Sequence, residues 1–134
     1  MTLAPVTTLP LLGMVQPVPG FPDHRDYVLV TADGEGMLFW LQSMDAGGPR
    51  FLAIAPGRFF PDYAPVLPAS VRADLELADG AEPALFCLVT VPPEGPSAAT
   101  VNLRAPVVVN PGNWRATQVV LPDATHPIRR PLRR

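Results

Sequence analysis

Hydrophobic residues along the chain fall into short runs that are separated by turn-forming residues. Six of these runs are about five to eight residues long and rich in Val, Leu, Ile and aromatic residues. They read "DYVLV", "GMLFWLQS", "RFLAIA", "ALFCLVTV", "APVVVN" and "ATQVVLP". Several are apolar at consecutive rather than alternate positions, which predicts strands covered on both faces, as in a closed barrel or a two-sheet sandwich.

Proline and glycine divide these runs and limit helix formation. The chain has 19 prolines and 10 glycines, and proline is excluded from helix interiors and from central strand positions. Turns are predicted at "TADGEG", "DAGGP", "ADGAEP", "PPEGPS" and "NPGN". Only "LPASVRADLEL" favours a helix, with Pro68 in its first turn. We therefore predict an all-β fold, a small pseudo-barrel of two packed antiparallel sheets with at most one short helix.

The length and composition predict one soluble domain. The 134 residues form one unit, 1–134, with a proline-rich N-terminal segment, 1–18, and an arginine-rich tail, 127–134. Apolar residues make up 48% and charged residues 16%, but no apolar run is long enough to span a membrane. The N-terminus has no basic region typical of a signal peptide. We expect a cytoplasmic protein without membrane contact, and take a monomer as the default.

Charge is unevenly distributed along the chain. The formal net charge is -2, and no basic residue lies between Arg72 and Arg104. The last six positions, in contrast, hold four arginines. An acidic body repels nucleic acid, so we predict no direct RNA or DNA binding. The acids in the stretch without bases are Asp74, Glu76, Asp79, Glu82 and Glu94.

Residues for catalysis or metal binding are sparse. Cys87 is the single cysteine, and its place in an apolar run predicts a buried side chain rather than a reactive thiol. His24 lies beside Asp23 and Asp26, but a solvated loop is the simpler interpretation, and His126 lies in an extended segment near the end. No phosphate-binding or hydrolase motif is found. We predict no enzymatic activity, no cofactor and no metal.

The stretch "TVNLRAPVVVN", 100–110, combines an apolar run with polar interruptions. Pro106 cannot donate a backbone hydrogen bond, which predicts a sheet edge or a bulge, with regular pairing resumed in "VVVN". Asn102 and Arg104 would share one strand face. Asn102 could then satisfy backbone groups and Arg104 could pair with an acid, while the same exposed edge could receive a partner segment.

Four blocks, in this order and spacing, resemble the FliW family of flagellar assembly factors. They are Pro19-Gly20-Phe21, the "FWLQS" run from Phe39, "FFPDY" from Phe59 and "NLRAP" from Asn102. The resemblance extends from about Pro19 to Leu132, although the segment before Pro19 is short where the family carries a fuller first strand pair. It implies a non-enzymatic protein that binds flagellin and, when free of it, binds the translational repressor CsrA away from its RNA-contacting surface. Flagellin translation would thereby be regulated.

Candidate partner-binding residues follow from both arguments. An acidic body complements a basic RNA-binding repressor. Amphipathic flagellin helices need an apolar groove with aromatics such as Phe59, Phe60, Tyr63 or Trp114, although at least one of the two phenylalanines should lie in the core. Asp62 and Tyr63 are expected at the surface, where a strand meets a proline-broken loop. The candidates are Asp62, Tyr63, Asp74, Glu76, Asn102, Arg104 and Asn110.

Three alternatives remain open at this stage. The protein could be a flagellin chaperone without a repressor partner, a small β module that binds a ligand such as a carbohydrate, or a metal-dependent hydrolase of unrecognised type. A carbohydrate module should present coplanar Trp and Tyr residues, of which the chain has two each. A hydrolase should show a pocket where several polar groups converge.

Overall fold

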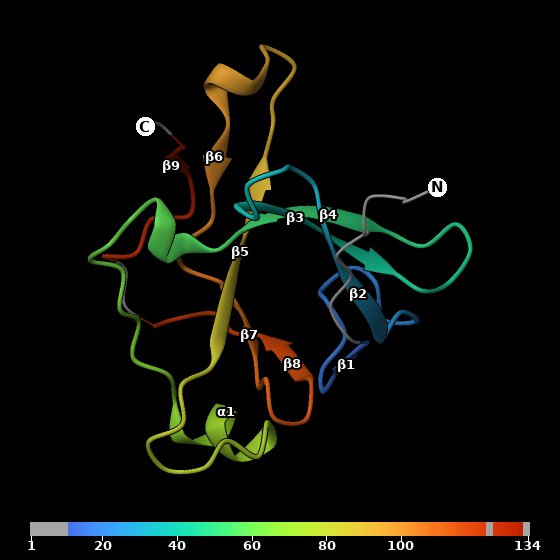
Figure 1. Cartoon of the computed structure of the whole chain (residues 1–134), viewed down its shortest axis with the longest axis vertical. Helices are drawn as coiled ribbons and strands as arrows, with labels where there is room; N and C mark the ends of the chain where they lie inside the picture. Colours follow the sequence, from blue (N-terminus) through green and yellow to red (C-terminus); the bar gives the residue numbers. More distant parts are fainter. Residues whose placement is uncertain (1–10, 123–124, 133–134) are drawn as a thin grey trace, which may run out of the picture.

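The computed structural model describes residues 11–122 and 125–132, which form a small β-barrel with short helices (Figure 1). The helical elements are the 3-10 turns η1 and η2 and the helix α1, at Pro56–Arg58, Pro96–Ala98 and Ala69–Asp74. The strands are β1 Leu12–Met14, β2 Asp26–Thr31, β3 Leu38–Ser43, β4 Arg50–Ile54, β5 Ala84–Thr90, β6 Thr100–Val101, β7 Val107–Val109, β8 Arg115–Gln118 and β9 Arg130–Pro131.

Seven strands close into a ring in the order β4-β3-β2-β1-β8-β7-β5. The closing contact pairs β4 with β5, where Ala53 lies opposite Leu88 and Ile54 opposite Cys87. Closure removes the free strand edges that an open sheet would expose. The all-β prediction with one short helix is confirmed, and the closed barrel is the form it takes. One pairing in the ring, β1 with β8, is parallel rather than antiparallel.

All six apolar runs of the sequence form strands, β2 to β5, β7 and β8. The prediction missed β1, which lies inside the proline-rich segment 1–18. Leu12 and Met14 of β1 are buried, and Gly13 pairs with both Asp26 and Arg115. The short segment before Pro19 therefore still supplies a strand to the barrel wall.

Beyond the barrel, the chain forms a small extension that covers a strand edge (Figure 1). The end of β5 pairs with β6, and β6 pairs with β9, with Val101 opposite Arg130. Within the described part of the arginine-rich tail, Arg130 and Pro131 thus form a strand. The hypothesis that the edge at 100–101 is open to a partner segment is wrong, because β9 already occupies it.

The stretch 102–106 is a turn that separates β6 from β7. Pro106 is buried, and its carbonyl accepts the backbone N–H of Val119 at 2.9 Å. Asn102 Oδ1 accepts the N–H groups of Arg104 and Ala105, so its predicted role in satisfying backbone groups is confirmed. The prediction that Asn102 and Arg104 share one strand face is wrong, because neither residue lies on a strand. Pairing of Arg104 with an acid stays a prediction; its Nε donates to the carbonyl of His126.

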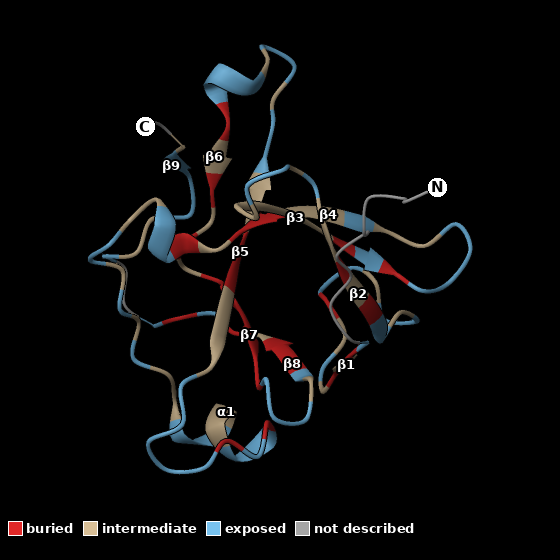
Figure 2. Cartoon of the chain, viewed as in Figure 1, coloured by how far each residue is buried: buried red, intermediate tan, exposed pale blue. Residues whose placement is uncertain are grey.

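Buried side chains form three clusters. Figure 2 shows that buried residues are found on most of the barrel strands. Strand β7 contributes to two of the clusters, since Val107 and Val109 face the barrel interior while Val108 packs under α1. This confirms the prediction of strands covered on both faces. The third cluster contains Cys87, fully buried as predicted. Each fully buried Val or Leu contributes roughly 1.5–3 kcal/mol to the free energy of unfolding.

Helix α1 is held by packing rather than by its own caps. It is six residues long, fewer than two turns, with Pro68 directly before it rather than in its first turn, and no side chain caps its N-terminus. Leu75 and Leu77, which follow the helix, are buried against Val108, Val119 and Leu121. No helix in the described ranges is long and apolar enough to cross a membrane.

Candidate functional site

The extended segment 63–68, here called the strap, crosses the outside of the barrel between η1 and α1. Its first residue is anchored because the Tyr63 hydroxyl donates to the carbonyl of Leu103 at 2.6 Å. Near its other end, Leu67 packs against the cluster under α1. Between these anchors Val66 is 87% exposed, an unusual position for a large aliphatic side chain. Pro65 and Pro68 favour the extended backbone.

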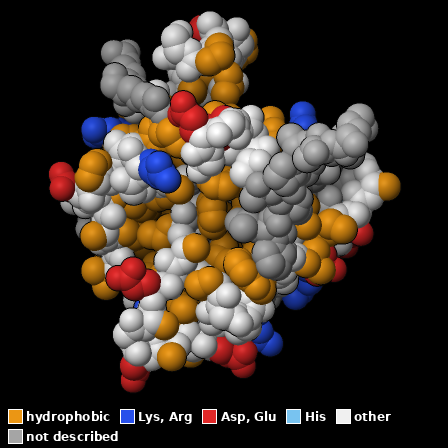
Figure 3. Space-filling view, in the orientation of Figure 1, with side chains coloured by type: hydrophobic (Ala, Val, Ile, Leu, Met, Phe, Trp, Pro, Cys, Tyr) orange, Lys and Arg blue, Asp and Glu red, His pale blue; other side chains and the backbone are white. Residues whose placement is uncertain are grey.

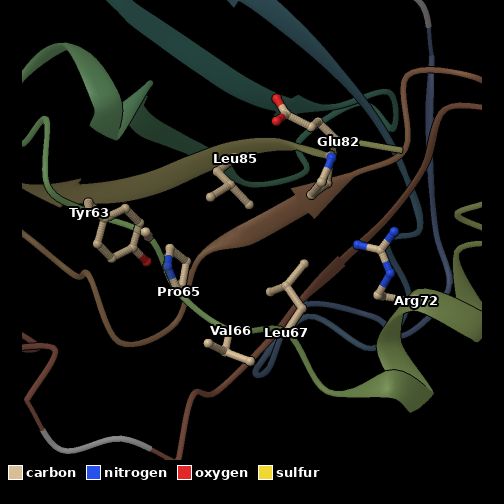
Figure 4. A pocket seen from close by; sticks show the side chains of 9 residues that line it. Tyr63, Pro65, Val66, Leu67, Arg72, Glu82 and Leu85 are labelled. Carbon is tan, nitrogen blue, oxygen red and sulfur yellow. The ribbon is translucent and has the colours of Figure 1, made fainter. Parts of the chain in front are cut away.

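The strap forms one wall of an apolar groove (Figure 4). Tyr63, Pro65 and Leu67 lie along the strap, and Leu85 of β5 lies across from them. The groove has a volume of about 460 Å³ and ends at the side chains of Arg72 and Glu82. A second hollow of about 410 Å³ lies against the same segment, which Ala64, Val66 and Pro68 line together with Leu121 and His126.

Hydrophobic side chains are therefore concentrated on this face of the molecule (Figure 3). An apolar patch of this kind on a protein surface marks a place where another molecule binds. The groove is open and elongated along the strap, which suits a helix or peptide better than a compact metabolite.

An acidic ridge adjoins the groove. It consists of four exposed carboxylates on the last turn of α1 and the loop that leads to β5. Arg72 lies among them, but its guanidinium donates to the carbonyls of Ala78 and Ala81 and so holds the loop. Figure 3 shows acidic side chains at the lower edge of the molecule, where Figure 1 places α1. The ridge residues are Asp74, Glu76, Asp79 and Glu82.

The ridge is fixed to the turn between β7 and β8. Asn110 is buried, and its Nδ2 donates to the carbonyls of Leu75 at 2.8 Å and Glu76 at 3.3 Å. Asn113 Nδ2 donates to the Leu75 carbonyl and to Glu76 Oε1, both at 3.1 Å. The Arg115 Nε atom lies 3.7 Å from Glu76 Oε1, an exposed pair of little energetic weight.

The predicted site residues thus separate into two groups. Asp74, Glu76 and Asn110 come together at the end of α1, although Asn110 is buried and its amide is occupied within the chain. Asp62 is exposed as expected, whereas Tyr63 is only partly exposed. Burial, with a smaller effect of Cys87, raises the pKa of the Tyr63 hydroxyl well above its usual value, so it stays protonated and donates.

The second group lies at the turn 102–106. The Leu103 carbonyl accepts the hydrogen bond from the Tyr63 hydroxyl, and Arg104 Nε donates to the carbonyl of His126. Asn102 and Arg104 are partly buried, and neither lines the strap groove. Sequence reasoning did not single out Val66, Leu67 or Leu85. The signal for Val66 and Leu67 was the apolar "APVLP", in which flanking prolines leave aliphatic residues without a strand to join, whereas Leu85 lies in a strand run and had no separate signal.

The aromatic candidates for a groove have different positions. Phe59 and Phe60 both pack against the cluster that contains Cys87, which confirms that at least one of them belongs to the core, and both remain partly exposed. Tyr63 lines the strap groove. Trp114, with a positive φ of 60°, packs against the barrel cluster instead.

One further polar cluster joins His24 to the turn between β3 and β4. Its Nδ1 lies 3.1 Å from Ser43 Oγ and 3.0 Å from Asp45 Oδ2, so the neighbouring acid is Asp45 rather than Asp23 or Asp26. Both contacts use the same ring nitrogen, whereas a nucleophile-activating imidazole bridges its partners through opposite nitrogens. In the described residues, no group of three or more His, Cys, Asp or Glu side chains could hold a metal ion.

The fold and surface indicate a class of protein. It is a small closed β-barrel protein whose main surface features, an apolar groove and an acidic ridge, suit contact with other proteins. The family model described as FliW protein matches residues 4–132. The chain is 37% identical over 113 residues to the flagellar assembly factor FliW of Syntrophotalea carbinolica, covering 84% of this chain and 79% of the relative. It is 36% identical over 110 residues to that of Syntrophus aciditrophicus, covering 82% and 69%.

A solved structure shares the fold. The crystal structure of a flagellar assembly factor FliW superposes with a TM-score of 0.81 at 25% identity, covering 92% of this chain and 86% of that one. The chain belongs to the FliW family of flagellar assembly factors. Membership implies that it acts through protein–protein interaction in flagellar assembly.

Proposed function

We propose that this protein binds flagellin in the cytoplasm and, when free of flagellin, binds and antagonises the translational repressor CsrA, so regulating flagellin translation. It acts as a monomer without a cofactor, a metal or an enzymatic activity of its own. The single observation that carries the proposal is that the apolar groove and the acidic ridge meet at Glu82, in a chain of the FliW family.

Flagellin occupies the apolar groove along the strap in this proposal. An amphipathic helix needs a hydrophobic trough that accepts side chains at helical spacing. Leu67 and Leu85 provide the apolar floor, Tyr63 closes one end, and the exposed Val66 provides a contact on the outer side of the strap. Burying these side chains under a partner would remove from water the side chain of Val66, which is 87% exposed.

The repressor contacts the acidic ridge. A basic RNA-binding protein is attracted by Asp74, Glu76 and Asp79, which raises the association rate and favours this partner over acidic ones. Asp62 and the turn with Asn102 and Arg104 stay as further candidate contacts. Asn110 acts indirectly, by holding the ridge in place, because its buried side chain is out of a partner's reach.

Competition between the two partners follows from the shared border. Glu82 lines the groove and also belongs to the ridge, so a helix in the groove would crowd a protein bound at the ridge. Flagellin binding would then exclude the repressor without a large conformational change.

The test is a calorimetric titration of the protein against CsrA and flagellin separately, at low and high salt, followed by competition. We expect micromolar or tighter binding to both, with strong salt dependence only for CsrA. Binding to flagellin alone would reduce the protein to a flagellin chaperone. Binding to neither would refute the proposal. Simultaneous binding of both would refute the claim that the two partners compete at Glu82.

A further inference from the structure

A separate cleft lies on the other side of Tyr63, between η1 and the C-terminal segment. We call it the aromatic cleft. Phe59, Phe60 and Tyr63 line one side, and His126 and Arg130 line the other. Its volume is about 450 Å³.

Contacts between its walls hold the cleft in shape. The rings of Tyr63 and His126 meet edge to face, with centroids 5.3 Å apart. The Leu103 N–H donates to the carbonyl of Pro127 at 3.0 Å, and Arg104 Nε donates to the carbonyl of His126 at 2.8 Å. Binding of a ligand in this cleft would therefore cost little conformational entropy for ordering the cleft residues.

The aromatic side of the cleft is supported from below. Phe59 and Phe60 pack against the buried cluster of Ile54 and Cys87 yet stay partly exposed. The guanidinium carbon of Arg130 lies 5.3 Å from the centroid of the Phe60 ring. Stacking of this kind orients the guanidinium while leaving N–H groups at its edge for a ligand.

Positive charge around the cleft is not neutralised by the described residues. Arg58, Arg129 and Arg130 are exposed, and none of them forms an ion pair within the described ranges. Figure 3 shows basic side chains near η1 and β9 on the viewed face. One acid, Asp62, also lines the cleft. The cleft thus combines aromatic side chains with one lining arginine, Arg130, and its sequence neighbour Arg129 is also exposed.

We propose that the aromatic cleft binds an acidic peptide segment of a partner protein. A carboxylate of the segment binds the guanidinium group of Arg130, and an apolar side chain lies on Phe59 and Phe60. Arginine pairs with carboxylates through two parallel hydrogen bonds, and an adjoining aromatic surface adds apolar burial.

This site adjoins the strap groove, with which it shares Tyr63, but it contains none of the acidic-ridge residues. The acidic ridge would repel such a segment. In the strap groove the lining cation is Arg72, whose guanidinium already donates to two backbone carbonyls. Arg130→Gln should therefore leave the titration against CsrA, which is assigned to the acidic ridge, unchanged.

The test uses the full chain labelled with ¹⁵N and a synthetic peptide that alternates Glu with Phe and Leu. We expect amide shifts at Phe59, Phe60 and His126, and an affinity that falls with salt. A peptide with Gln in place of Glu should bind about tenfold more weakly.

Two variants test the cation. Arg130→Glu should lower the peptide affinity at least about tenfold, and Arg130→Gln, which is less disruptive to the fold, should lower it severalfold. Arg50→Glu is the matched control, because Arg50 is also exposed and stacked on an aromatic ring, Trp40, at 4.3 Å. It should change the affinity less than about twofold. Asp62→Asn should strengthen binding by removing a repulsive carboxylate.

Several results would overturn the proposal. Equal binding of the neutral peptide would show that only apolar contact matters. Equal loss in the Arg50 and Arg130 variants would show a general charge effect. Shifts confined to the strap would place the peptide in the groove, and concentration-dependent dimers abolished by Arg130→Glu would make a second copy of this chain the occupant.

Discussion

The side-chain amide of Asn110 donates to the backbone carbonyl of Leu75 at 2.8 Å, joining positions 35 residues apart in sequence. This bond supplies an acceptor group at the end of α1 with a donor from another part of the fold. Asn110 Oδ1 meanwhile accepts the N–H of Gly112 at 2.8 Å, which shapes the turn between β7 and β8. The position of the acidic ridge therefore depends on a buried amide that is not itself acidic.

Replacing Asn110 with Ala should destabilise the protein markedly. The change removes a donor from the carbonyl of the buried residue Leu75, and it removes the acceptor of the Gly112 N–H. We expect the free energy of unfolding to fall by about 2–3 kcal/mol, measured by urea unfolding at pH 7.

Asn113→Ala is the matched control for Asn110→Ala. Asn113 also donates to the Leu75 carbonyl, at 3.1 Å, but its side chain is exposed and water can replace it. A loss of about 0.5–1 kcal/mol is expected. Equal losses for the two variants would mean that burial does not increase the contribution of the Asn110 hydrogen bonds to the free energy of unfolding.

Glu76 should tolerate glycine better than alanine. Its backbone has a φ of 57°, a left-handed conformation that side chains with a Cβ disfavour. Both substitutions remove the same exposed carboxylate, so their difference isolates the backbone. Glu76→Gly should be more stable than Glu76→Ala by about 1 kcal/mol in urea unfolding. The opposite order, normal for a helix interior, would show that this conformation is not kept in solution.

Cys87 should make the protein less stable at alkaline pH. Burial raises the pKa of its thiol from 9.0 to about 11, with a smaller opposing effect of the Tyr63 hydroxyl. The folded state thus binds the proton more tightly than the unfolded state does. The contribution of the protonated Cys87 thiol to the free energy of unfolding is fully present below about pH 9. It is lost as the pH rises through 11, and it amounts to roughly 2–3 kcal/mol at most.

Urea unfolding between pH 8 and pH 11 measures this loss. Cys87→Ala is the control, and it should be less stable at pH 8 because it leaves a small cavity. Its stability should then fall less steeply between pH 9 and pH 11. Parallel curves for the two proteins would assign the alkaline loss to other groups.

The barrel could be predicted from sequence largely because its strands are apolar on both faces. The run "PVVVN" illustrates this, since Val108 packs outward under α1 while its two neighbours face the barrel interior. Runs of this kind, cut by proline and glycine, have few alternatives to a strand. The burial of Cys87 and the backbone role of Asn102 could also be predicted, because each depends on residues close by in the sequence.

What could not be predicted depends on tertiary contacts. Strands β1, β6 and β9 have only two or three residues each, and they are strands because a neighbour is there to pair with them. Asn110 was proposed as a partner contact, but its distance in sequence from Leu75 hid its structural bond. The strap groove exists only because β5 lies opposite Leu67, which no pattern within 63–68 reveals.

Charge reversal on the ridge should separate the two proposed partners. Asp74→Lys combined with Glu76→Lys places positive charge where a basic repressor approaches, while the apolar groove stays intact. We expect the CsrA affinity to fall at least about tenfold at low salt, mainly through slower association, and the flagellin affinity to change less than about twofold. Stopped-flow and calorimetric titrations measure both.

Glu94→Lys is the control for this pair, because it makes the same kind of charge change in an exposed loop next to η2, at the end of the molecule opposite α1 (Figure 1). It should leave both affinities within about twofold of the wild type, since charges farther apart than the Debye length are screened. Since Glu76 also accepts a hydrogen bond from Asn113, Asp74→Lys alone separates lost charge from a displaced ridge. Equal loss for both partners, or for neither, would contradict the assignment of the repressor to the ridge.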